Sequence, residues 1–225
     1  MQGFPWRLVT FDIDGTLTTI HGWELFARRT GRLDEYREAN RRLHDHLTGE
    51  DEHLEELLDL AVGLDRTEVE SVLASTPRIT GIPETIERFH ALGAKVALLT
   101  HNPDYVCDWY RTRFGFDDAE GVEGHFLEAD HVVASGPVRA DKRGGLERLL
   151  HRLRTAAAQV AHVGDSWPDA QIFPRVGAGV AVNSSNPQVE QAADLALHLT
   201  DLRPLVPSLS ALTPRKPVND GAALR

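Results

Sequence analysis

The sequence predicts an α/β fold, in which a parallel β-sheet carries helices on both faces and a small all-helical segment follows the first strand. Two observations support this prediction. Short apolar runs rich in β-branched residues recur along the chain with helical segments between them, which is typical of parallel sheets. Between the first and second runs, residues 18–80 change to apolar residues at helical spacing. We therefore expect a sheet core that is interrupted by a helical insertion.

The first predicted strand ends in two acids. Residues 8–11 form a short apolar run, and Asp12 and Asp14 follow it before a turn at Gly15. In open α/β sheets, ligands bind at the carboxyl ends of the strands. Two carboxylates beside each other at that edge repel, and a cation or a shared proton must offset the repulsion. We expect a divalent cation held by oxygen ligands there, with one carboxylate free for chemistry.

The insertion over residues 18–80 is predicted to be a bundle of helices. Its segments with helical spacing are 23–30, 33–47, 54–61 and the stretch that begins at Asp65. Asp65 is the predicted N-cap of the last helix, because Glu68 three residues later completes a capping box. Gly31 is the predicted end of the first.

Helices and strands alternate beyond residue 80. The predicted helices cover residues 82–92, 103–114, 142–156 and 187–193. The predicted strands cover residues 95–100, 159–165, 177–182 and 195–197. Residues 122–137 are interpreted as a pair of short strands or a flap. The predicted domains are a core of residues 1–17 and 81–205, a cap of residues 18–80, and a flexible tail over 206–225.

Composition limits the class of protein. With 225 residues, 41% of them hydrophobic and 26% charged, the chain is typical of soluble globular proteins. Cys107 is the only cysteine, so no internal disulfide can form, and this fits a reducing compartment. No apolar stretch has the length of a membrane span, and the start of the chain lacks the layout of a signal peptide. We expect a cytoplasmic protein without a membrane partner.

Charge argues against nucleic acid as a partner. The net charge is −10, whereas nucleic-acid binding draws on a basic face. Lysine is rare, since only Lys95, Lys142 and Lys216 occur. Lys142, at the start of a predicted helix, is therefore more noticeable than a lysine would usually be.

Polar residues gather at the predicted strand ends and at one helix start. They are Asp12 and Asp14, then Thr100, His101 and Asn102, then Lys142, then Asp165 and Asp169. Because the carboxyl ends of parallel strands share one edge of a sheet, these side chains can converge. Carboxylates hold hard cations, and a lysine, a hydroxyl and loop amides suit a phosphate. The sequence therefore predicts a combined metal and anion site.

These motifs resemble those of the haloacid dehalogenase superfamily, and within it the phosphoserine-phosphatase-like subfamily. The residues that carry the resemblance are Asp12-Ile13-Asp14-Gly15-Thr16, Leu98-Leu99-Thr100, Lys142 and Gly164-Asp165-Ser166-Trp167-Pro168-Asp169. They occur in the family's order, and the resemblance extends from residue 7 to about residue 201. It implies a Rossmann-like core with a helical cap.

The resemblance also implies an activity. A phosphatase of this kind hydrolyses a small phosphate monoester with Mg²⁺ through an aspartyl-phosphate, and Asp12 would be the nucleophile. Asp14 would protonate the leaving alkoxide and later deprotonate the attacking water. The side chains of Asp12 and Asp165 and the backbone carbonyl of Asp14 would bind the metal. The presence of Asp14 favours phosphatases over dehalogenases, which have no alkoxide to protonate.

The remaining motif residues would bind the phosphate. By the same resemblance, Thr100 and His101 would contact its oxygens, and Lys142 would neutralise charge on the phosphate and on Asp12. Asp169 would orient Lys142 or a metal-bound water.

The substrate side departs from the phosphoserine phosphatases. Their glutamate for the substrate amino group falls near His21 here, and the cap arginine for the carboxylate has no match around residues 55–58. His21 and Asn102 become the candidate substrate contacts. We expect a small phosphorylated metabolite other than phosphoserine as the main substrate of a monomer or homodimer.

Two rival functions stay open at this point. One is a phosphotransferase or mutase, in which the aspartyl-phosphate passes to a sugar. The other is a non-catalytic module that binds a phosphometabolite, although such a module would not need Asp14. His44, His46 and His53 are interpreted as a solvated helix face rather than a zinc site, because residues two apart on a helix do not face each other. Trp167 lies in the fourth motif, and the sequence leaves open whether it is a core residue or a platform for the substrate.

Overall fold

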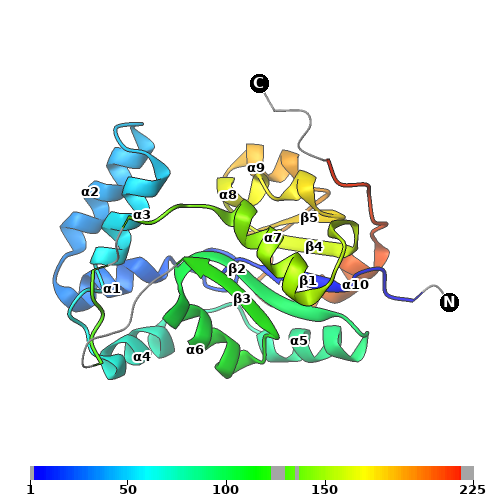
Figure 1. Cartoon of the computed structure of the whole chain (residues 1–225), viewed down its shortest axis with the longest axis horizontal. Coiled ribbons are helices and arrows are strands. Elements are labelled where there is room, and N and C mark those ends of the chain that lie inside the picture. Colours follow the sequence, from blue (N-terminus) through cyan, green and yellow to red (C-terminus); the bar gives the residue numbers. More distant parts are fainter. Residues whose placement is uncertain (1–2, 123–129, 135–136, 219–225) are drawn as a thin grey trace.

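The computed structural model describes residues 3–122, 130–134 and 137–218. Its strands are β1 (Leu8–Phe11), β2 (Lys95–Pro103), β3 (Asp118–Val122), β4 (Val160–Gly164), β5 (Ala178–Val182) and β6 (Leu195–Leu197). They form one six-stranded parallel sheet in the order β3-β2-β1-β4-β5-β6 (Figure 1). The predicted α/β class is confirmed, and β1 lies near the middle of the sheet between β2 and β4.

The core helices cover both faces of this sheet (Figure 1). They are α5 (Ile82–Ala91), α6 (Asp104–Phe114), α7 (Lys142–Leu153), α8 (Trp167–Ala170), α9 (Pro187–Ala192) and α10 (Leu205–Ala211). Alternate residues of β1 show the two faces: Val9 and Phe11 pack with α5 and α6, while Leu8 packs with α7. Strands buried on both faces read as continuous apolar runs, which explains the sequence of β1.

The helical insertion lies between β1 and β2, as predicted, and forms a separate lobe (Figure 1). It consists of α1 (Gly22–Thr30), α2 (Leu33–His44), α3 (Glu50–Asp59) and α4 (Arg66–Ser75). The capping box of Asp65 and Glu68 is present, and Gly31 ends α1 in the left-handed conformation with φ of 74°. We call α1–α4 the cap; the domain limits at residues 18 and 80 stay predictions.

Strand β3 was missed by the sequence analysis, which placed its short strands or flap at residues 122–137. The strand ends where that segment begins, and residues 123–129 and 135–136 lie outside the described residues. The strand was not recognised in the sequence because its two acids, Asp118 and Glu120, interrupt the apolar pattern that predicts a buried strand. Arg148 and Arg152 of α7 pair with these acids across the edge of the sheet.

The flexibility of the tail stays a prediction, but a helix that the sequence analysis did not predict lies at its start. Helix α10 packs on the core, and the carbonyl of its fully buried Leu209 accepts a hydrogen bond of 2.8 Å from Trp6 Nε1. Further on, Arg215 pairs with Asp194 at 3.0 Å. The prolines around this helix suggested disorder, but burial of its apolar residues decides the conformation. Residues 219–225 lie outside the described residues.

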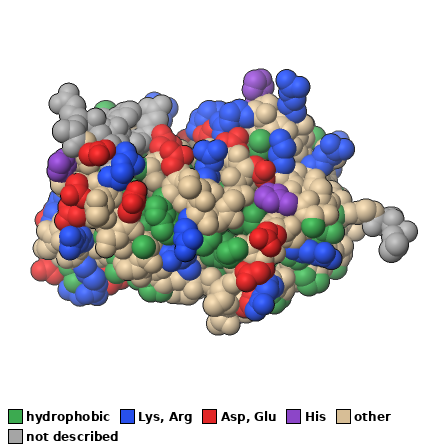
Figure 2. Space-filling view, turned by 90° about the horizontal axis from the view of Figure 1, so that it is seen from below, with side chains coloured by type: hydrophobic (Ala, Val, Ile, Leu, Met, Phe, Trp, Pro, Cys, Tyr) green, Lys and Arg blue, Asp and Glu red, His purple; other side chains and the backbone are tan. Residues whose placement is uncertain are grey.

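Charged side chains of both signs are interspersed over the face seen in Figure 2. Within the described ranges, no helix is both long enough and apolar enough to cross a bilayer.

Candidate active site

Asp12 directly follows β1, at the carboxyl edge of the sheet. Its backbone N–H donates to the Val163 carbonyl of β4 at 2.9 Å, which extends the sheet pairing and fixes the residue in place. The side chain is only 6% exposed, and its Oδ1 lies 2.9 Å from Lys142 Nζ. Burial raises the pKa of Asp12, while Lys142 opposes the rise.

Lys142 is the first residue of α7 and bridges two carboxylates. Its Nζ lies 2.6 Å from Asp169 Oδ1 in addition to the contact with Asp12, and the residue is 5% exposed. Burial alone would lower the pKa of Lys142, but Asp12 and Asp169 outweigh it and hold the pKa above its ordinary value. The ammonium group therefore stays charged, and a pair of ion contacts fixes it beside Asp12.

Asp169 is fully buried and accepts hydrogen bonds from five donors. Oδ1 accepts from Lys142 Nζ and from His162 Nε2 at 3.0 Å. Oδ2 accepts from the backbone N–H groups of Asp165 and Ser166 and from Ser166 Oγ. Burial works to raise the pKa of Asp169, but Lys142 and His162 overcome it and hold the pKa well below its usual range. These contacts occupy both oxygens, so Asp169 suits the positioning of Lys142 better than metal binding.

His162 is a member of this network that the sequence analysis missed. It is fully buried in β4, and its Nδ1 lies 2.9 Å from Thr10 Oγ1 in β1. Thr10 and His162 are register partners in the parallel pair, so both side chains leave the sheet on the same face. The available signal was a polar residue in each of two otherwise apolar strands.

Asp165 follows β4 and faces the turn after β1. Its Oδ1 accepts a hydrogen bond of 2.9 Å from Thr16 Oγ1. Gly15 has φ of +81°, and a Cβ there would lie 2.3 Å from Asp165 Oδ2. The missing side chain of Gly15 thus makes the space that Asp165 occupies. Burial, together with Asp12 and Asp169, raises the pKa of Asp165 to about 8.

The acidic cluster has the charge that suits a cation. Ligand oxygens of Asp12, Asp165 and Asp169 all lie within 4.8 Å of one another, and Lys142 supplies one positive charge to the three. Among the described residues, no hydrogen bond reaches Oδ2 of Asp12 or Oδ2 of Asp165. Two carboxylates, of the buried Asp12 and the partly buried Asp165, each with an oxygen that accepts no described hydrogen bond, fit a hard divalent ion such as Mg²⁺.

Asp14 is held from both domains. Its Oδ1 accepts a hydrogen bond of 2.7 Å from the backbone N–H of Gly22, the first residue of α1. Its Oδ2 accepts one of 3.0 Å from Asn102 Nδ2. The same amide group donates to Thr100 Oγ1 at 3.0 Å. Asn102 was predicted to contact substrate, and this engagement favours instead a role in positioning Asp14 and Thr100.

A cavity of about 810 Å³ lies between the acidic cluster and the cap. Most of the predicted site residues line it, namely Asp12, Asp14, His21, Thr100, His101, Asn102 and Lys142. Asp165 and Asp169 lie beside it, in contact with Thr16 and Lys142 respectively. The structure thus brings all the predicted site residues to one edge of the sheet, and their individual roles stay predictions. Burial lowers the pKa of His101 to about 3, so its imidazole is neutral.

The cap histidines do not form a metal site. His44, His46 and His53 line the same cavity, but the only described group of three ligand atoms close enough for an ion is the aspartate cluster. His44 and His46 are exposed, as expected for a solvated helix face, but His53 is buried, so this interpretation was wrong for His53.

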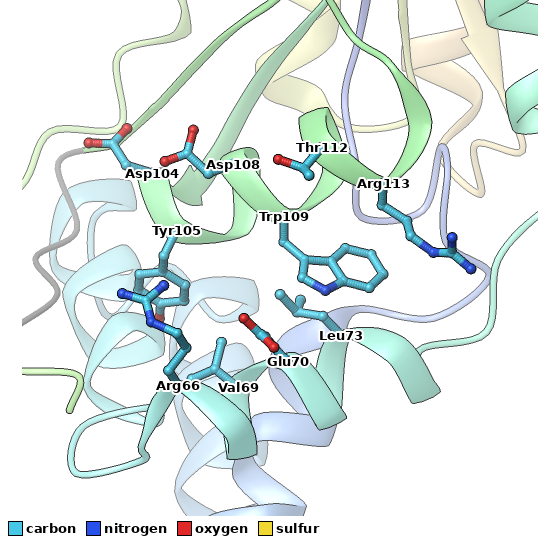
Figure 3. A pocket seen from close by; sticks show the side chains of 10 residues that line it. All are labelled: Arg66, Val69, Glu70, Leu73, Asp104, Tyr105, Asp108, Trp109, Thr112 and Arg113. Carbon is cyan, nitrogen blue, oxygen red and sulfur yellow. The ribbon is translucent and has the colours of Figure 1, made fainter. Parts of the chain in front are cut away.

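A second cavity, of about 690 Å³, lies between α4 of the cap and α6 of the core. Figure 3 shows the Trp109 indole of α6 facing Leu73 of α4, with charged side chains around them. None of the predicted site residues lines this cavity, whose charges have both signs. The cavity beside the aspartate cluster is therefore the candidate active site.

The comparison with protein-family models decides the family. Residues 6–177 match the model of the haloacid dehalogenase-like hydrolases. This chain belongs to that family. The match covers the aspartate cluster and Lys142, and it confirms the resemblance that the motifs indicated.

Curated relatives of this haloacid dehalogenase-like hydrolase include phosphoserine phosphatases. One from Streptomyces coelicolor is 30% identical over 199 residues, which cover 86% of this chain and 48% of that protein. Another, from Vibrio cholerae, is 27% identical over 214 residues, which cover 91% of this chain and 63% of that protein. This hydrolase therefore spans about half to two thirds of the length of these relatives.

Solved structures share the fold. A substrate-bound phosphoserine phosphatase superimposes with a TM-score of 0.76 at 20% identity, covering 90% of this hydrolase and 98% of that chain. A hydrolase of the same family from Salmonella enterica gives a TM-score of 0.81 at 17% identity, covering 90% and 71% of the two chains. At sequence identities of 20% and 17%, this structural similarity shows a shared fold, namely the sheet and the inserted helices.

Proposed function

We propose that this protein is a Mg²⁺-dependent phosphatase that hydrolyses a phosphate monoester through an aspartyl-phosphate on Asp12. The observation that carries the proposal is the buried contact between Asp12 and Lys142, beside Asp165 and at the floor of a cavity. Lys142 engages only one oxygen of Asp12, and each carboxylate oxygen has two lone pairs. Asp12 can therefore attack phosphorus through one oxygen while the other contacts a cation.

The chain's own residues supply most of the catalytic steps. Lys142 stays protonated and stabilises negative charge on the phosphoryl oxygens and on Asp12. Asp14, held by Gly22 and Asn102, donates a proton to the leaving alkoxide and later takes one from water. Thr100 offers its hydroxyl to a phosphoryl oxygen. Asp12 and Asp165 would hold Mg²⁺ with the carbonyl of Asp14, and the ion supplies electrostatic stabilisation of the phosphoryl group when bound.

Phosphoserine is disfavoured as the main substrate. The relatives are phosphoserine phosphatases by name, and a phosphoserine carboxylate calls for a cationic partner. Among the described residues that line the cavity, Lys142 is the only lysine or arginine, and it is engaged by two aspartates. Glu24, one turn from the expected place of an ammonium ligand, instead pairs with Arg28 at 2.6 Å.

A cytoplasmic location is part of the proposal. Cys107 is buried and unpaired, which suits a reducing compartment, and no described helix spans a membrane.

Removal of the metal tests the proposal directly. An aryl phosphate should be hydrolysed with Mg²⁺ present, and EDTA should reduce the rate at least about 100-fold, with recovery on adding Mg²⁺. Acid quenching during turnover of a ³²P-labelled substrate should leave label on the protein, and Asp12→Asn should carry none. Hydrolysis that resists EDTA, or label on Asp12→Asn, would contradict the proposal. Transfer of label to added alcohols rather than to water would indicate a phosphotransferase.

The turn at Gly15 gives a second prediction. Gly15→Ala should reduce kcat about 100-fold, because the new Cβ displaces Asp165. Gly31→Ala is the matched control, since Gly31 has a similar φ of +74° but a Cβ added there would meet nothing within 4 Å. Both variants carry the backbone strain of a left-handed alanine, so a comparable loss of kcat in both would show that Asp165 is not the cause.

A further inference from the structure

The cavity beside Asp12 has a chemical character that the catalytic residues do not explain. On the cap side, large apolar and aromatic side chains line it together with polar ones. The first group is Trp23, Tyr36, Leu43, Leu54 and Leu57, and the second is His21, Asn40, His44, His46, Thr48, Glu50 and His53. Its volume of about 810 Å³ is within the range of sites that enclose drug-sized ligands. A three-carbon leaving group would occupy only a small part of this volume. The cavity therefore has more space than the small metabolite expected from the sequence would need.

Trp167 lies on the opposite, core side of this cavity. It is 49% exposed, which is unusual for so large an apolar side chain, and it lines the cavity together with Asp12 and Lys142. An indole face left open to a cavity is a surface on which a planar or apolar group can stack.

The position of Trp167 is fixed by the catalytic network itself. It begins α8 between Ser166 and Pro168, two residues after Asp165. Ser166 and Asp169 form a capping box around it, and Asp169 also holds Lys142. The indole is therefore attached to the same rigid turn that positions the reacting groups.

The charges in the cavity indicate an uncharged leaving group. The arginines between residues 28 and 42 pair with acids of the cap: Arg28 with Glu24, Arg29 with Glu68, Arg32 with Glu35, Arg37 with Asp34, Arg41 with Glu38 and Arg42 with Glu56. Both oxygens of Asp14 accept hydrogen bonds already. Apart from Asp12 and Asp14, the one carboxylate among the described lining residues is Glu50, which is exposed at the start of α3. Of the histidines that line the cavity, His53 is buried, and burial lowers its pKa and that of His101, so both favour the neutral form. A charged carboxylate or ammonium of the substrate therefore finds no buried partner of opposite full charge there.

We propose that the cavity selects phosphate monoesters of bulky, uncharged alcohols that carry a flat apolar group, and that Trp167 is the specificity-determining residue on which this group stacks. The inference rests on the proposed phosphatase function and names its substrate class. In the proposed step a carboxylate oxygen of Asp12 forms a bond to phosphorus while the P–O bond to the alcohol breaks, and Asp14 gives the leaving alkoxide its proton.

The test compares primary-alcohol esters, so that the leaving alkoxides are chemically similar. With Mg²⁺ saturating, kcat/KM should be at least about tenfold higher for phenethyl phosphate than for ethyl phosphate. Neohexyl phosphate has the shape of phosphocholine without its charge, and it should be the better substrate of the two. Phosphoserine should be poorer than phenethyl phosphate.

Variants of Trp167 separate stacking from catalysis. Trp167→Ala should reduce kcat/KM for phenethyl phosphate about tenfold and change that for ethyl phosphate by less than about twofold. Trp167→Phe should keep most of the preference, because it keeps a flat ring. Val62→Ala is the control, since Val62 is 37% exposed and does not line the cavity.

Each outcome bears on one of the two proposals. Equal kcat/KM for ethyl and phenethyl phosphate, or a preference that Trp167→Ala leaves intact, overturns the inference while the phosphatase proposal stands. Phosphocholine exceeding neohexyl phosphate also overturns it, in favour of a cation site. If no ester is hydrolysed in a way that depends on Asp12, the phosphatase proposal fails and this inference fails with it.

Discussion

Asp12→Asn is expected to reduce the turnover of phosphate monoesters by at least about 10⁴-fold, because an amide cannot attack phosphorus. Removal of a nucleophile from a preorganised site leaves only the rate that binding and charge stabilisation provide. The measurement is kcat for an aryl phosphate at saturating Mg²⁺, with the protein checked for folding by circular dichroism.

The same substitution should not destabilise the fold. Burial raises the pKa of Asp12 above its ordinary value, so ionising this carboxylate costs folding free energy, and the cost builds up as pH rises from the unfolded pKa to the folded pKa. A neutral amide of the same shape removes this cost. We expect Tm measured without metal at pH 7 to equal or exceed that of the wild type.

This combination of results distinguishes a catalytic role from a structural one. Loss of turnover together with a lowered Tm would indicate that Asp12 acts mainly in the fold. Asp34→Asn is the control, since its side chain is 97% exposed and pairs only with Arg37. Retention of turnover in Asp12→Asn would contradict the nucleophile assignment.

Asp169→Ala is expected to have the largest effect on stability, a loss of about 3–5 kcal/mol in the free energy of unfolding. Five donors lose their acceptor at once, and the buried ammonium of Lys142 keeps only Asp12 as a partner. An unpaired donor in a buried site costs its full desolvation penalty. The loss is measured by urea denaturation at pH 7.

Two companion variants locate the origin of this loss. Asp169→Asn keeps the shape and one acceptor oxygen, so it should recover part of the stability while kcat stays low, because Lys142 is no longer held by a charge. His162→Ala removes one hydrogen bond to Asp169 and should lower stability by a smaller amount than Asp169→Ala. Asp34→Ala, at an exposed ion pair, should leave the unfolding midpoint essentially unchanged. A stability loss for Asp169→Ala no greater than for Asp34→Ala would show that the network is not needed for folding.

Much of the catalytic site could be predicted because it depends on local order along the chain. An apolar run followed by acids predicts a strand end, and parallel strands bring their ends to one edge. The order of these motifs predicts that Asp12, Asp14, Lys142 and Asp165 lie together. The 3.6-residue spacing of apolar residues in 18–80 predicts the helical cap.

The features that the sequence did not predict depend on contacts between residues that are far apart in the chain. Edge strand β3 carries acids that only its partners Arg148 and Arg152 explain, and those arginines lie far along the chain. Helix α10 was missed because its few apolar residues gain their stability from burial against the core rather than from propensity. The partnership of His162 with Thr10 depends on strand register, which one sequence does not fix.

The sequence by itself determined the fold class, the inserted cap, the family and the set of residues at the carboxyl edge of the sheet. These follow from periodicity and motif order, which are properties of short segments. Only the tertiary structure decided that Asp169 accepts hydrogen bonds from five donors, that Asn102 holds Asp14, and that Trp167 borders a large cavity lined by apolar, aromatic and polar side chains of the cap. The physical reason is that burial and hydrogen-bond satisfaction belong to three-dimensional neighbours, and residues distant in the chain supply them.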